Sequence, residues 1–254
     1  RARPSLEGDP GRRGDALRTL AEANALVGAW NDAIDARRAA AETLEEAGRP
    51  AEAAIELLTL ADRHAAAVEV PRGLEAARRA ISLAIEVDRV DLRVQGLSLE
   101  GLLLATRGDS ARAIETIKTA LDLALEHDLT EAAAEAHRRL GVAYNLSSDY
   151  RTAGEAFSQA VQFCETHGDA AQRELCLGCM AWAHFQMGDW KRAGELCQEV
   201  RADEEAPAGL RAIALGVLGL VGAHRGELRP ARRFLEQAAA LMAPHEAVAM
   251  ELIV

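Results

Sequence analysis

The chain has 254 residues, with 29 lysines and arginines against 40 aspartates and glutamates, so its net charge is −11. Alanine accounts for 54 residues, whereas proline and glycine account for only 7 and 20. Alanine is the best helix former and a poor strand former, so this composition excludes a β-sandwich or β-barrel. Nucleic-acid backbones are bound by basic surfaces, so the acidic balance argues against direct nucleic-acid binding.

Apolar residues recur at helical spacing along almost the whole chain, and no segment alternates with the period of a strand. In chain order, the predicted helices span 15–27, 31–47, 50–68, 72–87, 91–106, 110–127, 130–146, 150–167, 170–187, 190–202, 207–224 and 228–242, with a thirteenth beginning near His245. Residues 1–13 are expected to form an N-terminal extension, and Asp9 or Asp15 would cap the first helix. No internal boundary is visible, so we expect one all-α domain over residues 1–254.

One segment defines an internal repeat: Leu140, Gly141 and Tyr144 share one helix face, and Ala153 and Phe157 lie on the next helix. The same frame recurs around six anchor alanines separated by 44, 36, 40, 40 and 38 residues, namely Ala33, Ala77, Ala113, Ala153, Ala193 and Ala231. A pair of helices repeated at this spacing predicts a helical solenoid. Small residues would let the paired helices approach, and a larger side chain such as Phe157 would fill the adjacent space.

This pattern resembles the tetratricopeptide repeat (TPR) family, whose first helix carries L-G-x-x-Y and whose second carries A-x-x-x-F-x-x-A. The match is close from Leu140 to Ala160, and the resemblance extends over nearly the whole chain from about Gly14. It implies a right-handed α-solenoid of about six TPR-like helix hairpins. The family's unit has about 34 residues, so we expect longer helices here and a longer link between units, as at Leu125–Thr130. Such long units are similar to those in the sensor regions of large bacterial LuxR-type, maltose-activator-type and ATPase-linked regulators.

The resemblance also implies that the first helix of each hairpin lines a concave face. Side chains six and three residues before the small residue, and one and four after it, should then point into the groove, with Ala65 as the small residue of the second unit. The candidate partner-binding residues at such positions are Arg18, Asp62, Gln95, Glu135, Arg138, Asn145, Trp182 and Phe185.

These candidates change in character along the chain, from charged in the early units to apolar in the last two. Trp182 and Phe185 would anchor an amphipathic helix or an extended peptide, and Arg138 and Asn145 would hydrogen-bond its backbone. The simpler alternative is that the two aromatic residues pack on neighbouring repeats and that the polar residues form a solvated helix face.

The sequence contains no phosphate-binding loop, dinucleotide-binding glycine motif, nucleophile elbow or H-E-x-x-H motif, so we expect no enzyme activity, no cofactor and no metal site. Cys176 and Cys179 would be neighbours on a helix, but no second ligand pair accompanies them, and buried free thiols are the simpler interpretation. The apolar run Ala212–Ala223 is too short to span a bilayer, and no signal sequence is visible. We therefore expect a cytoplasmic protein with no membrane partner.

Together these features favour a non-catalytic scaffold or sensor module that binds a protein or peptide, within a bacterial transcriptional or signalling regulator. The uncapped apolar end Glu251–Val254 suggests a segment of a longer protein, whose ATPase or DNA-binding domain would be a further partner. The alternative is an accessory region that presents substrates to a multidomain enzyme such as a transferase or cyclase. Formation of a homo-oligomer through the apolar region Ile213–Val254 is a third hypothesis.

Overall fold

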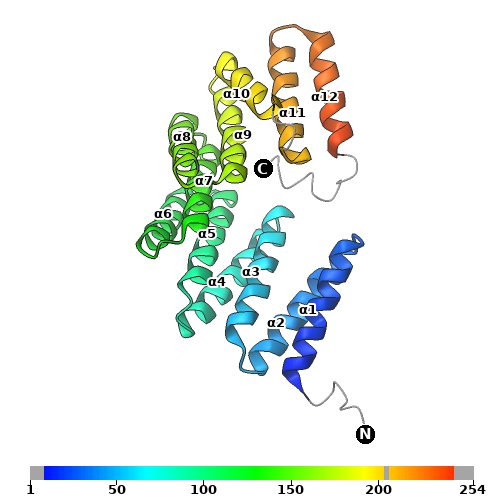
Figure 1. Cartoon of the computed structure of the whole chain (residues 1–254), viewed down its shortest axis with the longest axis vertical. Helices are drawn as coiled ribbons and strands as arrows, with labels where there is room; N and C mark the ends of the chain where they lie inside the picture. Colours follow the sequence, from blue (N-terminus) through cyan, green and yellow to red (C-terminus); the bar gives the residue numbers. More distant parts are fainter. Residues whose placement is uncertain (1–8, 203–205, 243–254) are drawn as a thin grey trace.

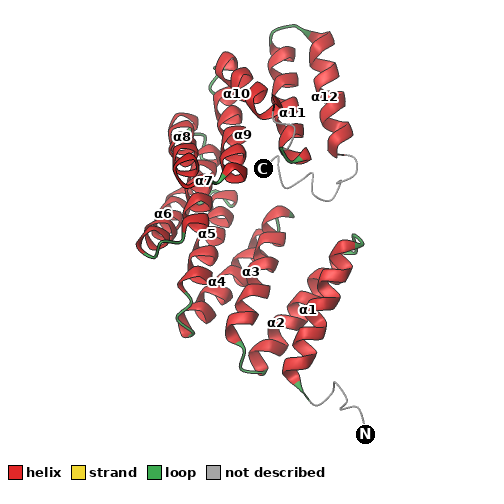
Figure 2. Cartoon of the chain, viewed as in Figure 1, coloured by secondary structure: helices red, strands yellow, loops and turns green. Residues whose placement is uncertain are grey.

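A computed structural model describes residues 9–202 and 206–242, which form twelve α-helices and no strand (Figures 1 and 2). The helices are α1 (Pro10–Leu26), α2 (Trp30–Glu46), α3 (Pro50–Ala66), α4 (Val70–Glu86), α5 (Val90–Thr106), α6 (Ser110–Glu126), α7 (Thr130–Leu146), α8 (Tyr150–His167), α9 (Ala170–Gln186), α10 (Trp190–Ala202), α11 (Ala208–His224) and α12 (Leu228–Met242). The all-α solenoid expected from the sequence is confirmed. The predicted helix near His245 lies outside the described residues.

The helices follow a fixed period, because α1 to α10 begin at every twentieth residue from Pro10 to Trp190. Short turns join them, and a residue with φ between 53° and 89° stands in each turn of this series and between α11 and α12. These residues are Gly28, Gly48, Val68, Asp88, Gly108, Asp128, Ser148, Gly168, Gly188 and Gly226. The link from α6 to α7 is as short as the others, so the expectation of a longer link was wrong. The additional residues of each unit lie in the helices.

This strict period corrects the register of the second unit. The residue 40 positions after Ala33 and 40 before Ala113 is Gly73, so Gly73, not Ala77, is the anchor of this unit. By the same spacing, Ala61, not Ala65, is the small residue at the helix crossing. Ala61 is fully buried. The alanine-rich sequence accommodates both registers, and the position of the helix start at Pro50 decides between them.

The first helix also begins earlier than residue 15. Asp9 is its N-cap and accepts a hydrogen bond from the Arg12 backbone N–H at 3.3 Å, while Pro10 occupies the first helical position. The sequence offered both Asp9 and Asp15 as caps, and the structure uses Asp9. Gly14 is buried in α1, and a Cβ atom at this position would lie 2.8 Å from the Leu44 side chain, so tertiary packing requires a glycine inside the helix.

The two helices of a hairpin cross at the small residues. A Cβ atom on Gly141 would lie 2.5 Å from the Phe157 ring, and one on Gly101 would lie 2.3 Å from Ile117. Phe157 and Ile117 are 1% and 0% exposed. Each large side chain therefore fills the space that the opposing glycine leaves, as the repeat pattern predicts.

The helices form two layers along the solenoid (Figure 1). In the described chain, α3 contacts α5, α5 contacts α7, α7 contacts α9 and α9 contacts α11, whereas no even-numbered helix has a comparable contact with the next even-numbered one. The odd-numbered helices therefore converge on the inner, concave side and the even-numbered helices spread on the outer side. Among the described helices, none is long and apolar enough to cross a membrane.

Close packing at Gly141 predicts a measurable cost for one methyl group. Gly141→Ala should lower the free energy of unfolding by about 1–3 kcal/mol relative to Gly194→Ala, because overpacking displaces the buried Phe157 ring. Gly194 also lies within a helix, but a Cβ atom there would meet no atom within 4 Å, so this control gains only helix propensity. Urea denaturation followed by circular dichroism measures the free energy of unfolding of both variants. Equal stability of the two variants would contradict the close contact between Gly141 and Phe157.

Candidate functional site: a pocket on the concave layer

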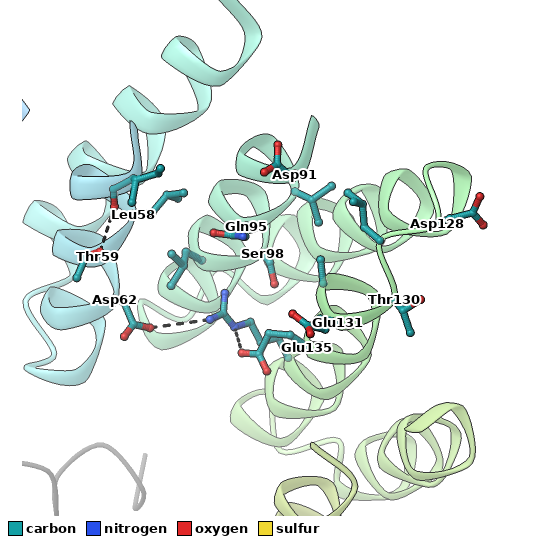
Figure 3. Close-up of a pocket in the computed structure, with 16 residues that line it drawn as sticks. Leu58, Thr59, Asp62, Asp91, Gln95, Ser98, Asp128, Thr130, Glu131 and Glu135 are labelled. Atoms are coloured by element: carbon teal, nitrogen blue, oxygen red, sulfur yellow. Dashed lines mark hydrogen bonds and ion pairs between the residues drawn. The ribbon is translucent and has the colours of Figure 1, made fainter. Parts of the chain in front are cut away.

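A pocket of about 700 Å³ opens on the concave side between α3, α5 and α7 (Figure 3). Its apolar lining comes from buried side chains of α3 and α5, including Leu58, Val94 and Leu99. Five carboxylates also line it, namely Asp62, Asp91, Asp128, Glu131 and Glu135. The only cation in the lining is Arg139, so the pocket combines an apolar floor with an acidic border.

Glu135 is the centre of the charge network at this site. Its carboxylate accepts two hydrogen bonds from Arg138, at 2.9 and 2.6 Å, and lies 2.6 Å from Nε of Arg139. Gln172 at the start of α9 donates a further hydrogen bond to Glu135. The carboxylate thus joins α7 to α9 and holds both arginine side chains in place.

The pKa of Glu135 reflects this network. Burial by itself would raise the pKa, but the positive charges of Arg139 and Arg138, together with the hydrogen bonds from Arg138 and Gln172, lower it from the ordinary 4.5 to about 2. Glu135 is therefore ionised over the whole physiological range. It acts as a structural anion, because its protonated form is scarce near neutral pH.

Two buried polar groups in the pocket lack hydrogen-bond partners among the described residues. Ser98 is 2% exposed, and Figure 3 shows its side chain directed toward Glu131 on α7. Arg139 is 8% exposed, and its Nε–H is not aligned with the nearby Glu135 oxygen, so that contact is an ion pair without a hydrogen bond. Unpartnered buried polar groups are costly and are expected to bind water or a ligand.

Three of the predicted groove residues meet in this pocket. Asp62, Gln95 and Glu135 line it from α3, α5 and α7 respectively (Figure 3). Asp62 and Gln95 are exposed, and Asp62 lies 3.9 Å from Nη2 of Arg139. Arg138 lies beside the pocket, and its guanidinium forms an ion pair with Glu135. These three helices thus bring together side chains that are far apart in the sequence.

The other charged candidate, Arg18, lies outside this pocket and joins two repeats. Its guanidinium contacts Glu56 at 3.0 Å and Glu52 at 3.1 Å, both on α3. Arg37 on α2 contacts the same Glu56 carboxylate at 2.7 Å, and Glu56 is only 2% exposed. Arg18 is therefore part of an ion-pair network that connects α1 and α2 to α3.

The remaining candidates lie on α7 and α9, outside the residues that line the pocket. Oδ1 of Asn145, near the end of α7, is buried and accepts no hydrogen bond within the described chain. Trp182 and Phe185 on α9 are half-buried and lie with ring centroids 5.5 Å apart. Phe185 also lies against the His224 ring, at 5.6 Å, so the two aromatic residues pack partly on the next repeat and retain partial exposure.

The sequence rule missed several pocket residues. Glu131 and Arg139 are ten and two residues before Gly141, outside the four positions that were considered, and Asp128 belongs to the turn before α7. Ile55 and Leu58 were missed because of the register error in the second unit. With Ala61 as the small residue, Ile55 and Leu58 fall six and three residues before it, where the rule expects groove residues. The corrected period would therefore have found these two residues.

The described residues contain no group of three or more histidine, cysteine or acidic side chains arranged to hold a metal ion. Cys176 is fully buried and Cys179 is half-buried, and burial raises the pKa of both thiols. The thiolate form, which binds metals and attacks electrophiles, is therefore disfavoured at neutral pH.

No protein-family model and no curated protein sequence matches this chain. Solved structures do match its fold. RapI in its apo form superposes with a TM-score of 0.66 and 15% identity over 91% of this chain and 64% of RapI, so this chain spans less than two thirds of that protein. A Rap protein complexed with Competence and Sporulation Factor gives a TM-score of 0.67 and 18% identity over 92% of this chain and 71% of that one.

A third similar structure is a Signal Transduction ATPase with Numerous Domains from Pyrococcus horikoshii that carries a tetratricopeptide repeat sensor. Its TM-score is 0.66 with 16% identity, over 98% of this chain and 39% of that protein. This chain is a TPR-like solenoid. At these identities the likeness establishes the architecture only.

The acid dependence of stability should reveal the role of Glu135. Because its pKa is lower in the folded than in the unfolded chain, Glu135 stabilises the protein above pH 4.5, and this contribution is lost as the pH falls toward 2. A pKa shift of this size corresponds to at most about 3–4 kcal/mol. Glu135→Gln should be less stable at neutral pH and should lose less stability between pH 4.5 and 2 than the original chain.

Denaturant titrations at several pH values measure this difference. Glu115→Gln is a suitable control, because Glu115 is exposed on α6 and forms no ion pair within the described chain. That variant should keep the original acid dependence. An unchanged pH profile for Glu135→Gln would show that the network does not depend on this carboxylate.

Proposed function

We propose that this protein is a non-catalytic module that binds a protein or peptide partner on its concave layer. The observation that carries the proposal is the distribution of buried side-chain polar atoms without hydrogen-bond partners. In the described chain all five lie on odd-numbered helices, namely in Ser98, Arg139, Asn145, His184 and Arg211. The outer layer contributes none.

Such groups gain free energy when a partner supplies donors or acceptors. A peptide backbone supplies both, at regular intervals. Asn145 carries a buried amide oxygen toward the end of α7, and half-buried Trp182 and Phe185 on α9 offer apolar area nearby on the same layer. Rigid aromatic groups next to polar anchors are typical of peptide-binding surfaces.

The structural neighbours support the same class of function. One is a Rap protein captured with Competence and Sporulation Factor, and another carries its repeats as the sensor of a signalling ATPase. We therefore infer that this chain acts as a scaffold or sensor in a bacterial transcriptional or signalling regulator in the cytoplasm. An ATPase or DNA-binding domain of the same protein would respond to occupancy of the concave layer.

Selection of peptides from a random library displayed on phage tests the proposal. Peptides selected against the chain should bind Trp182→Ala about ten-fold more weakly, because the aromatic anchor is lost. Asn145→Ala should also weaken binding. It should not lower the thermal midpoint, because it removes a buried oxygen that has no partner.

Leu125→Ala provides the matched control. Leu125 is 48% exposed on α6, on the outer layer, so its truncation should leave peptide affinity unchanged. Isothermal titration calorimetry measures the affinities and circular dichroism checks the fold. If no peptide is selected, or if the selected peptides are insensitive to both concave-layer variants, the proposal is wrong.

A further inference from the structure

We propose that the pocket between α3, α5 and α7 binds a lysine or arginine side chain of the partner peptide. This inference rests on the proposed function and specifies the chemistry of its ligand. It depends on the match between the pocket, which has an apolar floor and an acidic border, and a side chain with an aliphatic stem and a cationic head.

The acidic border retains negative charge after its internal ion pairs are counted. Arg89 neutralises Asp91, at 2.5 Å, and Arg138 and Arg139 surround Glu135. The carboxylates of Glu131 and Asp128 form no ion pair with any described residue, and both are exposed. Asp62 has only a long contact of 3.9 Å with Arg139, and Arg139 also forms a closer ion pair with Glu135. A cation entering between α3 and α7 would meet carboxylates that lack close counter-charges.

A second, independent feature points to a ligand. The Ser98 side chain is 98% buried, yet its hydroxyl has no hydrogen-bond partner among the described residues and points toward Glu131 in the pocket (Figure 3). The hydroxyl can accept a hydrogen bond from an ammonium or guanidinium group.

The apolar floor favours a peptide side chain over a simple cation. Leu58, Val94 and Leu99 are at most 6% exposed and line the pocket, and they would cover the methylene groups of lysine or arginine. A hydrated metal ion would gain nothing from such a surface. The described carboxylates are also not grouped closely enough to coordinate a metal ion.

The pocket is continuous with the rest of the concave layer through α7. Glu131, Glu135 and Arg139 stand on the first part of this helix, and Asn145 stands near its end, about 15 Å from Glu135 at 1.5 Å per residue. A partner with a basic residue in the pocket could therefore extend along α7 toward Asn145 and the aromatic residues of α9. The volume of about 700 Å³ lies within the range of typical ligand sites.

The test compares the residues enriched in peptides selected from a random phage library. Selection against the original chain should enrich lysine or arginine at one position. The double variant Asp62→Asn/Glu131→Gln should bind such a peptide about five- to ten-fold more weakly at low salt, because both partly exposed carboxylates lose their charge. The same peptide with norleucine in place of the basic residue should bind both proteins equally.

Glu115→Gln/Glu155→Gln is the control with the same change in net charge, since both residues are exposed on the outer helices α6 and α8. It should bind the basic peptide like the original chain. Ser98→Ala should weaken binding of that peptide about five-fold without lowering the thermal midpoint of the protein. A purely structural role of Ser98 would instead lower the thermal midpoint.

The outcomes separate this inference from the proposed function. If peptides are selected and depend on Trp182 or Asn145 but show no basic preference, the pocket assignment is wrong and the peptide-binding function stands. The same holds if the basic preference survives in the double variant. If no peptide is selected, both proposals fail.

Discussion

The structure depends on the close approach of paired helices at residues too small to keep them apart. At the crossing of α7 and α8, Gly141 leaves room for the Phe157 ring, and at the crossing of α5 and α6, Gly101 leaves room for Ile117. Both large side chains are almost completely buried. Because the same contact recurs with a fixed helix spacing, each hairpin adds to the last with a similar geometry, and the odd-numbered helices converge on one side.

That convergence explains why some polar side chains of the inner layer are buried without hydrogen-bond partners among the described residues. Inner helices contact one another, so side chains such as Ser98 and Arg139 are removed from water even though they face a concavity. Glu135 compensates part of this cost by binding two arginines and Gln172. Glu135, Arg138 and Arg139 are therefore held in place by one another beside the pocket, which reduces the entropy that ordering these three side chains would cost.

Groove positions could be predicted only where the repeat register was clear. Gln95 and Glu135, which the rule selected, line the pocket, because Gly101 and Gly141 mark their units without ambiguity. The rule slipped by one helical turn in the second unit, where alanines at both 61 and 65 satisfy the same pattern. Asp62 still faces the pocket, since the position one residue after Ala61 also points inward.

The sequence by itself determined the helices, the turns and the approximate period, because these follow from local propensity and from the spacing of small and large residues. Only the tertiary structure decided which charges are available to a partner. Arg18 was predicted to face the groove, yet its guanidinium is paired with Glu52 and Glu56 on α3, across the solenoid. Arg138 differs, because its partner Glu135 lies three residues earlier on the same helix, a pair that helical spacing by itself predicts. Glu131 has no such pair. Ion pairing between helices depends on distances across the solenoid, and no spacing along one helix encodes those distances.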